Sequence, residues 1–259
     1  MSRPRCGEEL LAPGHTPPPE LGHDAVHVWR AVLDQPAAPV AAMARHLSAE
    51  ETARADTLAF AQGRRRFVVG RGLLRVILSW YLRVAPAAVP LDRRRDGKPE
   101  LRGGSRLRFN VTHSAGIVLY AVAWGREVGI DLEVDRPLPR VARIAARALS
   151  SRERAVLFRI APSLRPRAFL QCWTRKEACM KATGEGLVRP PAEVEVTVAP
   201  AERPRLLSIG GDRRAARRWE LADLVGLSSA VATVAVEGSG WQLGRFLVDP
   251  AVLAGEAGP

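Results

Sequence analysis

The chain has 259 residues, of which 47% are hydrophobic, so it can bury a core in one large domain or two small ones. Its 39 basic and 27 acidic residues give a formal charge of +12, which favours anionic partners, although a composition rich in arginine produces such an excess by itself. The three cysteines argue against a disulfide framework, and no apolar run is long enough to span a membrane.

The amino-terminal segment, residues 1–24, is rich in proline and has no hydrophobic period, so we expect a flexible lead. The segment also lacks the apolar core of a secretory signal. Together with the missing membrane span, this predicts a cytoplasmic protein that has no membrane partner.

Residues 25–126 are expected to form a first half made of strands and helices. Ser48 followed by Glu51 has the S-x-x-E pattern of a capping box, which predicts that a helix begins there. In the remaining segments, apolar residues that alternate with polar ones predict strands, and apolar residues at helical spacing predict helices. These are a strand from residue 26, a long helix over 63–82, a loop over 92–104, and strands over 107–111 and 117–123.

Residues 127–243 are expected to form a second half, followed by a weak tail over 244–259. A strand is predicted at 128–133. Helical periods then predict three helices, and later strand-like runs predict three more strands. The helices are at 139–149, 151–160 and 166–183, and the strands are at 194–198, 205–209 and 228–236.

An internal repeat connects the two halves. Leu47-Ser48 recurs as Leu149-Ser150, 102 residues later (149 − 47), and four further identities keep this offset. Chance alone can produce so sparse a match, but a real repeat predicts two similar α+β halves with a cleft between them. The further identities pair Glu51 with Glu153, Ala53 with Ala155, Arg65 with Arg167 and Phe67 with Phe169.

Two carboxylates interrupt an apolar, strand-like run. Asp131 and Glu133 are two residues apart, so a strand points both to the same face. A buried charge needs a partner, which favours a functional role. The alternative is a pair of exposed acids on the polar face of an edge strand.

A second charged pair lies on the long helix of the second half. Glu177 and Lys181 are four residues apart and therefore share a helix face, with Lys176 as a further cation. Such pairs also decorate many exposed helices. Three acids and a lysine brought together would, however, seat a hard divalent cation and a phosphate.

A polar segment follows the strand that begins at residue 107. We expect Asn110 to Gly116 to form a turn that offers backbone N–H groups, hydroxyls and the His113 imidazole to an anion. The alternative is that His113 is a structural turn residue.

Taken together, four motifs in this order resemble the 4′-phosphopantetheinyl transferase superfamily, and the length resembles its Sfp-type branch. The resemblance covers roughly residues 47–190. It implies an α+β fold of two similar α/β halves related by a pseudo-twofold, with the active site in the cleft between them. The motifs are Gly97-Lys98-Pro99, Phe109 to Ser114, Gly129 to Glu133, and Trp173 to Ala178 with Lys181 and Gly184.

The resemblance implies transfer of 4′-phosphopantetheine from coenzyme A to a serine of an apo acyl or peptidyl carrier protein, with release of adenosine 3′,5′-bisphosphate. It implies Mg²⁺ as the metal, bound by Asp131, Glu133 and Glu177. Glu177 would also be the general base, and Lys181 would contact the phosphates. Catalytic roles are thus implied for Glu177, Lys181 and His113, and contacts with coenzyme A for Arg54, Arg66, Lys98, Pro99, Thr112, His113 and Lys181.

The chain departs from the family pattern at two places. Thr112 stands where a serine is more usual and keeps the hydroxyl, whereas Glu51 stands where a lysine is expected. Because of the second departure, the contacts with the 3′-phosphate are assigned by position, to Arg54 and Arg66 with Arg71 as a reserve.

Two functions of other classes compete with this one. A metal-dependent nuclease also combines spaced acids with a lysine, and a basic nucleic-acid-binding module would suit the positive charge. The nuclease leaves the Gly97-Lys98-Pro99 motif unexplained, and in a nucleic-acid-binding module Asp131 and Glu133 would repel the ligand. We therefore expect a carrier-protein partner, no nucleic acid, and a monomer, since one chain forms its own cleft.

Overall fold

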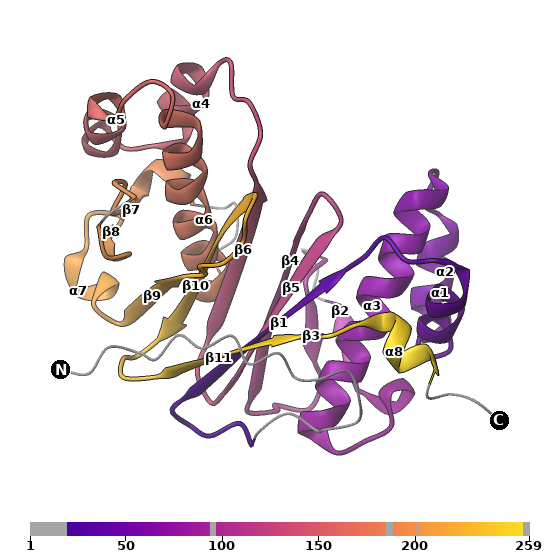
Figure 1. Ribbon diagram of the computed structural model, residues 1–259. Coiled ribbons are helices and arrows are strands. Elements are labelled where there is room, and N and C mark those ends of the chain that lie inside the picture. Colours follow the sequence, from indigo (N-terminus) through magenta and orange to yellow (C-terminus); the bar gives the residue numbers. More distant parts are fainter. Residues whose placement is uncertain (1–19, 94–96, 185–188, 201, 256–259) are drawn as a thin grey trace.

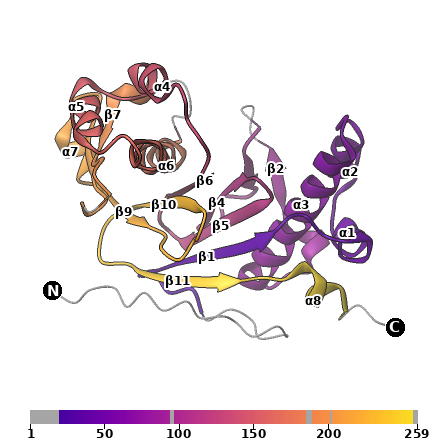
Figure 2. The same cartoon turned by 45° about the horizontal axis from the view of Figure 1, so that its top comes forward.

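The computed structural model describes residues 20–93, 97–184, 189–200 and 202–255 (Figure 1). Most of the expected flexible lead, residues 1–19, lies outside the described residues. Figures 1 and 2 show the helices on the two outer sides of the molecule and the strands between them. The described part therefore has four layers in the order helix, sheet, sheet, helix.

The first half packs helices on a four-stranded sheet. Trp29, Ile77 and Tyr120 are fully or almost fully buried where helix and sheet meet. The sheet has the order β11 (Gln242–Leu247), β1 (Ala25–Val32), β5 (Ile117–Trp124) and β4 (Leu107–Ser114). The helices are α1 (Ala37–Ala44), α2 (Ala49–Asp56) and α3 (Ala61–Leu82), followed by a 3₁₀ helix at Pro86–Ala88.

The second half packs one long helix on a three-stranded sheet. Phe169 and Cys172 of this helix belong to the buried core. The sheet has the order β6 (Val128–Val134), β10 (Ala230–Glu237) and β9 (Trp219–Asp223). The other elements are α4 (Val141–Ala148), α5 (Ser151–Arg159), α6 (Arg165–Thr183), a 3₁₀ helix at Pro191–Glu193, β7 (Val194–Val196), β8 (Leu206–Ile209) and α7 (Arg213–Ala216).

The predicted repeat is present in the structure. Strands β1, β5 and β4 have the same antiparallel order as β6, β10 and β9. Both capping boxes form: the backbone N–H of Ser48 donates to Glu51 at 2.9 Å, and that of Ser150 donates to Glu153 at 2.7 Å. The α+β fold with two similar halves is therefore confirmed.

A third apolar cluster joins the two halves. Val28 and Leu119 of the first sheet face Ile130 and Leu132 of the second, and all four side chains are buried. Because the strands alternate, each sheet uses one face for this junction and the other face for its own helices. The junction places β4 beside β6, the strand that carries the two predicted acids.

Several segments differ from the expectations. The predicted loop over 92–104 contains a short hairpin of β2 (Leu91–Arg93) and β3 (Pro99–Leu101). The predicted tail contains the end of β11 and helix α8 (Pro250–Gly255), and β11 pairs in parallel with β1, far away in the sequence. Helix α1 and strand β9 were not anticipated either. Such short elements have little period of their own, so their partners decide their conformation.

None of the helices in the described ranges combines the length and the apolar character that crossing a bilayer requires.

Candidate active site

The predicted acid Asp131 lies at the junction of the two halves. Only 6% of it is exposed, and its Oδ1 accepts hydrogen bonds from Lys181 Nζ at 2.6 Å and from Thr112 Oγ1 at 3.2 Å. Lys181 Nζ also donates to the carbonyl of Ile130 at 3.2 Å. The structure therefore brings together side chains from β4, β6 and α6.

A glycine allows this close approach of helix and strand. A Cβ atom at Gly129 would lie 2.1 Å from the carbonyl oxygen of Ala178 and 2.5 Å from the nitrogen of Ala182. Only a residue without a side chain fits there. Gly129 thus lets α6 rest directly on β6 and holds Glu177 and Lys181 beside Asp131.

The acids of the site oppose one another's ionisation. Burial raises the pKa of Asp131, and Glu133 adds to this, whereas Lys181 and Thr112 lower it. Burial also raises the pKa of the half-buried Glu177, and the carboxylates of Asp131 and Glu133 raise it further against the effect of Lys181. The three carboxylates therefore lie close enough to interact electrostatically.

The three acids do not form a ready-made metal cage. No group of three His, Cys, Asp or Glu side chains within the described ranges is arranged to hold an ion. Asp131 is paired with Lys181, and Glu133 is paired with Arg136 Nη1 at 2.5 Å. The donor set nevertheless fits Mg²⁺, since this ion prefers carboxylate oxygens, needs only one or two of them, and would relieve the repulsion that raises these pKa values.

Lys98 reaches the same place from the hairpin of the first half. Its Nζ donates to the carbonyl of Lys181 at 3.0 Å. Pro99, the first residue of β3, lines a cavity of about 280 Å³ with Lys98, Arg108 and Phe109. The Gly97-Lys98-Pro99 motif is thus adjacent to the charged cluster.

His113 is not part of that cluster. The segment predicted as a turn belongs to β4 up to Ser114, so Thr112 and His113 point to opposite faces. Thr112 is buried on the face that meets β6, whereas His113 is exposed on the face that carries Phe109 and Val111. The structure brings Thr112, but not His113, to Asp131.

The three arginines considered for the 3′-phosphate lie in two places. Arg66 donates two hydrogen bonds to Asp34, at 2.7 and 2.6 Å. Arg54 and Arg71 both lie against the ring of Phe67, at 5.6 and 5.8 Å from its centroid. The three arginines form a basic region on α2 and α3 that is separate from Asp131, Glu133 and Glu177.

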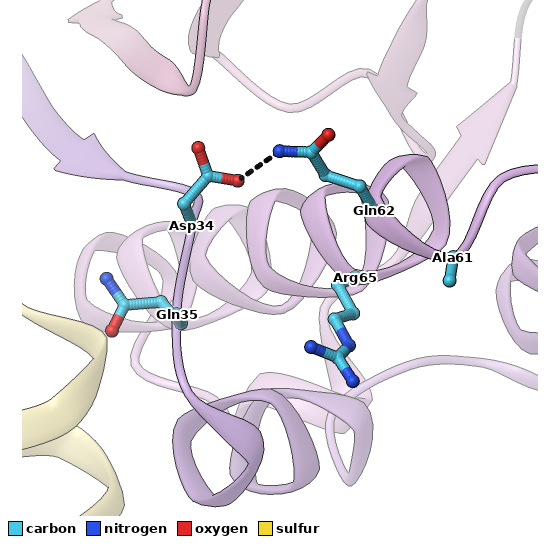
Figure 3. Close-up of a pocket in the computed structure, with 5 residues that line it drawn as sticks. All are labelled: Asp34, Gln35, Ala61, Gln62 and Arg65. Carbon is cyan, nitrogen blue, oxygen red and sulfur yellow. Dashed lines mark hydrogen bonds between the residues drawn. The ribbon is translucent and has the colours of Figure 1, made fainter.

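A second cavity lies beside the beginning of α3. It has a volume of about 450 Å³, and Gln62 Nε2 donates to Asp34 at 3.4 Å on its wall (Figure 3). Gln35, Ala61 and Arg65 complete the lining. The lining of this cavity includes none of Asp131, Glu133 and Glu177, the acids that the sequence predicted for the site.

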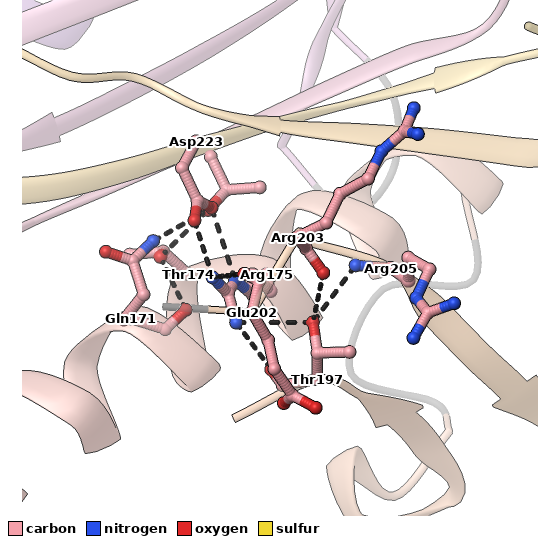
Figure 4. A network of polar contacts seen from close by, with 9 residues as sticks. Gln171, Thr174, Arg175, Thr197, Glu202, Arg203, Arg205 and Asp223 are labelled. Carbon is pink, nitrogen blue, oxygen red and sulfur yellow. Dashed lines mark hydrogen bonds and ion pairs between the residues drawn. The ribbon is translucent and has the colours of Figure 1, made fainter. Parts of the chain in front are cut away.

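Two cations of the fourth motif are structural. Lys176, considered above as a further cation of the site, is fully buried and paired with Glu153 at 2.6 Å. Arg175 is also fully buried and is paired with Asp223 at 2.6 Å, while it donates to the carbonyl of Thr197 at 2.7 Å (Figure 4). These contacts hold α6, so Lys176 is not available to a ligand.

Sequence reasoning missed the roles of Asn110 and Ser114. Asn110 is buried and its Oδ1 accepts the backbone N–H of Ile130 at 3.0 Å. Ser114 Oγ accepts the backbone N–H of Val134 at 3.3 Å. The alternation of polar residues at 110, 112 and 114 was the available signal, but it was assigned to a turn.

Comparison with known proteins gives two adjacent family matches. Residues 127–235 match the model of the 4′-phosphopantetheinyl transferase superfamily, and residues 29–124 match that of the 4′-phosphopantetheinyl transferase amino-terminal region. The two matches correspond to the second and the first half of the fold.

Two curated relatives have similar sequences. The chain is 40% identical over 230 residues to the 4′-phosphopantetheinyl transferase HetI of Nostoc sp., an alignment that covers 87% of this chain and 94% of that protein. It is 33% identical to a putative 4′-phosphopantetheinyl transferase of Synechocystis sp., with coverage of 62% and 65%.

A solved structure matches part of the chain. It is a holo-(acyl-carrier-protein) synthase from Bacillus anthracis in complex with CoA (3′,5′-ADP), with a TM-score of 0.36 and 23% identity. The match covers 44% of this chain and 96% of that one.

Proposed function

The chain belongs to the 4′-phosphopantetheinyl transferase superfamily, and on this premise we propose that it transfers the phosphopantetheine arm of coenzyme A to a serine of an apo carrier protein. The serine oxygen attacks the β-phosphorus of the pyrophosphate, and adenosine 3′,5′-bisphosphate leaves. The cluster of Asp131, Glu177 and Lys181 at the junction of the halves is the observation that carries the proposal.

Lys181 is proposed as the group that stabilises the charge of the transition state. In phosphoryl transfer this charge spreads over the oxygens around phosphorus. Lys181 Nζ is held by Asp131 Oδ1 and by the carbonyl of Ile130, so it is fixed before the substrate binds. A preorganised cation of this kind needs little rearrangement during the reaction.

Glu177 is proposed as the general base that takes the serine proton. Burial and the neighbouring carboxylates raise its pKa, which brings its proton affinity nearer to the operating pH. The contacts of Arg175 and Lys176 on the buried side of α6 hold the helix in place, while Glu177 is half-buried toward the junction.

Asp131, Glu133 and Glu177 are proposed to hold Mg²⁺. When bound, the ion neutralises negative charge on the pyrophosphate. Its binding requires that Asp131 and Glu133 share their oxygens with it or release Lys181 and Arg136, the present partners. The metal dependence of activity tests this assignment.

Coenzyme A is proposed to lie along the junction of the two halves. Lys98 and Pro99 line its nucleotide side, and Thr112 contacts its phosphates from the junction face of β4, whereas His113 would meet the coenzyme from the opposite face of the strand. Arg54 and Arg66, with Arg71 in reserve, are proposed for the 3′-phosphate. The separation of these arginines from the acids is compatible with a ligand that carries phosphates at two places.

The carrier protein is proposed as an acyl or peptidyl carrier of fatty-acid, polyketide or non-ribosomal peptide synthesis. The charge of +12 complements an acidic carrier surface. A cytoplasmic monomer is proposed because one chain supplies both halves of the junction. The alternatives, a nuclease and a basic nucleic-acid-binding module, have no support from the relatives described above.

Mass spectrometry of the carrier protein tests the activity. Apo carriers of the fatty-acid, polyketide and non-ribosomal types are incubated with coenzyme A and Mg²⁺, with a chelator-treated sample as control. The expected result is a mass increase equal to the phosphopantetheine arm on at least one carrier, which the chelator suppresses. No increase on any carrier, together with cleavage of DNA, would favour the nuclease.

A further inference from the structure

Two sheet edges meet at the junction of the halves without a backbone ladder. β4 is an outer strand of the first sheet and β6 is an outer strand of the second, and the ladders found in the described ranges do not pair them. Backbone N–H groups on a buried edge need acceptors, because an unpaired buried donor is costly. The backbone N–H groups at the edge of β6 therefore need acceptors from β4.

Side chains of β4 supply these acceptors. Asn110 Oδ1 accepts the N–H of Ile130 at 3.0 Å, and Ser114 Oγ accepts the N–H of Val134 at 3.3 Å. Between them, Thr112 Oγ1 donates to Asp131 at 3.2 Å. The three residues are two positions apart and thus lie on one face of the strand.

These contacts bracket the acidic pair. Ile130 directly precedes Asp131, and Val134 directly follows Glu133. The Ile130 residue is also held at both of its backbone polar groups, since its carbonyl accepts from Lys181 Nζ at 3.2 Å. The distance between β4 and β6 therefore sets where Thr112 lies relative to the carboxylate of Asp131, which Lys181 holds from the other side.

We propose that Asn110 and Ser114 are positioning residues for the transfer reaction, and this inference rests on the proposed function. They contact no reacting atom and act through the backbone of β6. A backbone ladder would bring the strands to about 4.8 Å, whereas bridging side chains keep the edges further apart. The space so kept is where the side chains of Thr112 and Asp131 meet.

Amide hydrogen exchange tests the bridging contacts without reference to activity. Asn110→Leu keeps the volume and removes the acceptor, so the exchange of the Ile130 amide is expected to be about tenfold faster. The Val134 amide is expected to keep its protection. Ser114→Ala should show the opposite pattern. Unchanged exchange at both amides would overturn the proposal.

Steady-state kinetics test the positioning role. In Asn110→Leu we expect kcat to fall by about 10- to 100-fold while the KM for coenzyme A changes by less than about twofold, because a displacement of the acids affects the chemical step. Ser114→Ala should lower kcat less, and Ser114→Thr, which keeps a hydroxyl, should restore it. A folded Asn110→Leu protein with normal kcat would overturn the role.

A destabilised control separates positioning from stability. Val69 is fully buried in the first-half core, away from the junction. Val69→Ala is expected to lower the melting temperature and to leave kcat unchanged at a temperature where it is folded. A loss of kcat in Val69→Ala as large as that in Asn110→Leu would overturn the positioning role. If the wild-type protein modifies no carrier, the proposed function fails, while the exchange pattern still tests the contacts.

Discussion

The two halves of the molecule share a frame, which is a set of ion pairs that recurs at corresponding places in each half. Asp34 pairs with Arg66 and Asp135 pairs with Arg167, so both partners recur 101 residues later (135 − 34 and 167 − 66). The structural counterpart of Arg167 is therefore Arg66, and not Arg65 as the offset of 102 predicted. The capping-box residue Glu51 pairs with a cation of α3, as Glu153 does with one of α6.

The shared frame extends to the carbonyls after each long helix. Arg75 of α3 is the partner of Glu51, at 2.6 Å, and donates to the carbonyls of Pro86, Ala87 and Val89. Lys176 of α6 donates in the same way to the carbonyls of Pro191 and Val194. A buried cation thus joins helix, cap and 3₁₀ turn in both halves, which explains why the halves have the same architecture.

The halves differ where the first strand meets the end of the long helix. In the first half Trp29 and Trp80 meet there, with ring centroids 5.0 Å apart. At the corresponding place in the second half, Asp131 and Lys181 form an ion pair at 2.6 Å. The frame is therefore common to both halves, whereas a few positions decide whether this place is apolar core or a charged cluster.

The C-terminal strand reinforces the difference. Phe246 of β11 stacks on Trp29 with centroids 4.7 Å apart, and β11 completes the edge of β1 by backbone pairing. Among the described residues, the edge of β6 is met by side chains instead, those of Asn110 and Ser114 from β4 and that of Lys181 from α6. The first half is therefore closed at this edge by backbone pairing, whereas in the second half the side chain of Lys181 stays 27% exposed beside the edge.

The largest effect is expected at Asp131, the charged residue that stands in the second half where Trp29 stands in the first. Asp131→Ala should lower the transfer rate by about a thousandfold, since several kcal/mol of charge stabilisation are lost. Carrier mass spectrometry measures the rate, and thermal unfolding checks the fold. Asp56→Ala, an exposed carboxylate of α2, is the control. Near-normal turnover in Asp131→Ala would contradict the metal role.

Substitution of Trp29, the apolar counterpart of Asp131, should lower stability and leave activity nearly unchanged. Trp29 is only 2% exposed, so Trp29→Ala should lower the free energy of unfolding by about 3–5 kcal/mol. Chemical denaturation measures this change. Activity per folded molecule should remain close to that of the wild type. A selective loss of turnover in the folded variant would show that the first-half position also serves the reaction.

Lys181→Ala should lower kcat by about 100-fold, because its charge is needed where the transition state becomes more negative. Some loss of stability is also expected, because the Asp131 side chain, only 9% exposed, loses its charged partner, although the 27% exposure of Lys181 limits the effect. Lys181→Arg keeps the charge and should recover part of the rate. A collapsed thermal transition in Lys181→Ala would instead assign the lysine to the fold.

The smallest effect is a shift in the pH profile. Because the pKa of Glu177 is raised, its carboxyl stays protonated to a higher pH than a free glutamate, and the base form is lost earlier as the pH falls. The acidic limb of kcat should therefore lie above the ordinary glutamate range, and less so at saturating Mg²⁺, which relieves the repulsion between the carboxylates but not the effect of burial. Glu133→Gln removes one cause of the raised pKa, so the limb should move to lower pH. A limb that does not move would argue against Glu177 as the base.

Local patterns were sufficient for the long elements and for the acids. Ser48 with Glu51, the helical period of α3, and the alternation around Asp131 each act over a few residues, and the structure has the elements that they predicted. The partners of short strands were not predictable in this way. β11 pairs with β1 across more than 200 residues of sequence, and its sequence has little that marks it as a strand.

Residue type and spacing by themselves predicted the long helices and strands and the pairs Asp131/Glu133 and Glu177/Lys181, while the family resemblance implied the two-half α+β architecture. Only the tertiary structure decided which face each polar side chain occupies: Thr112 meets Asp131, His113 points away, and Lys176 is buried in the frame. The reason is physical. Helical and strand periods follow from local sterics, whereas the partner of a side chain depends on which sheets and helices pack together, and short local patterns contain no information about that packing.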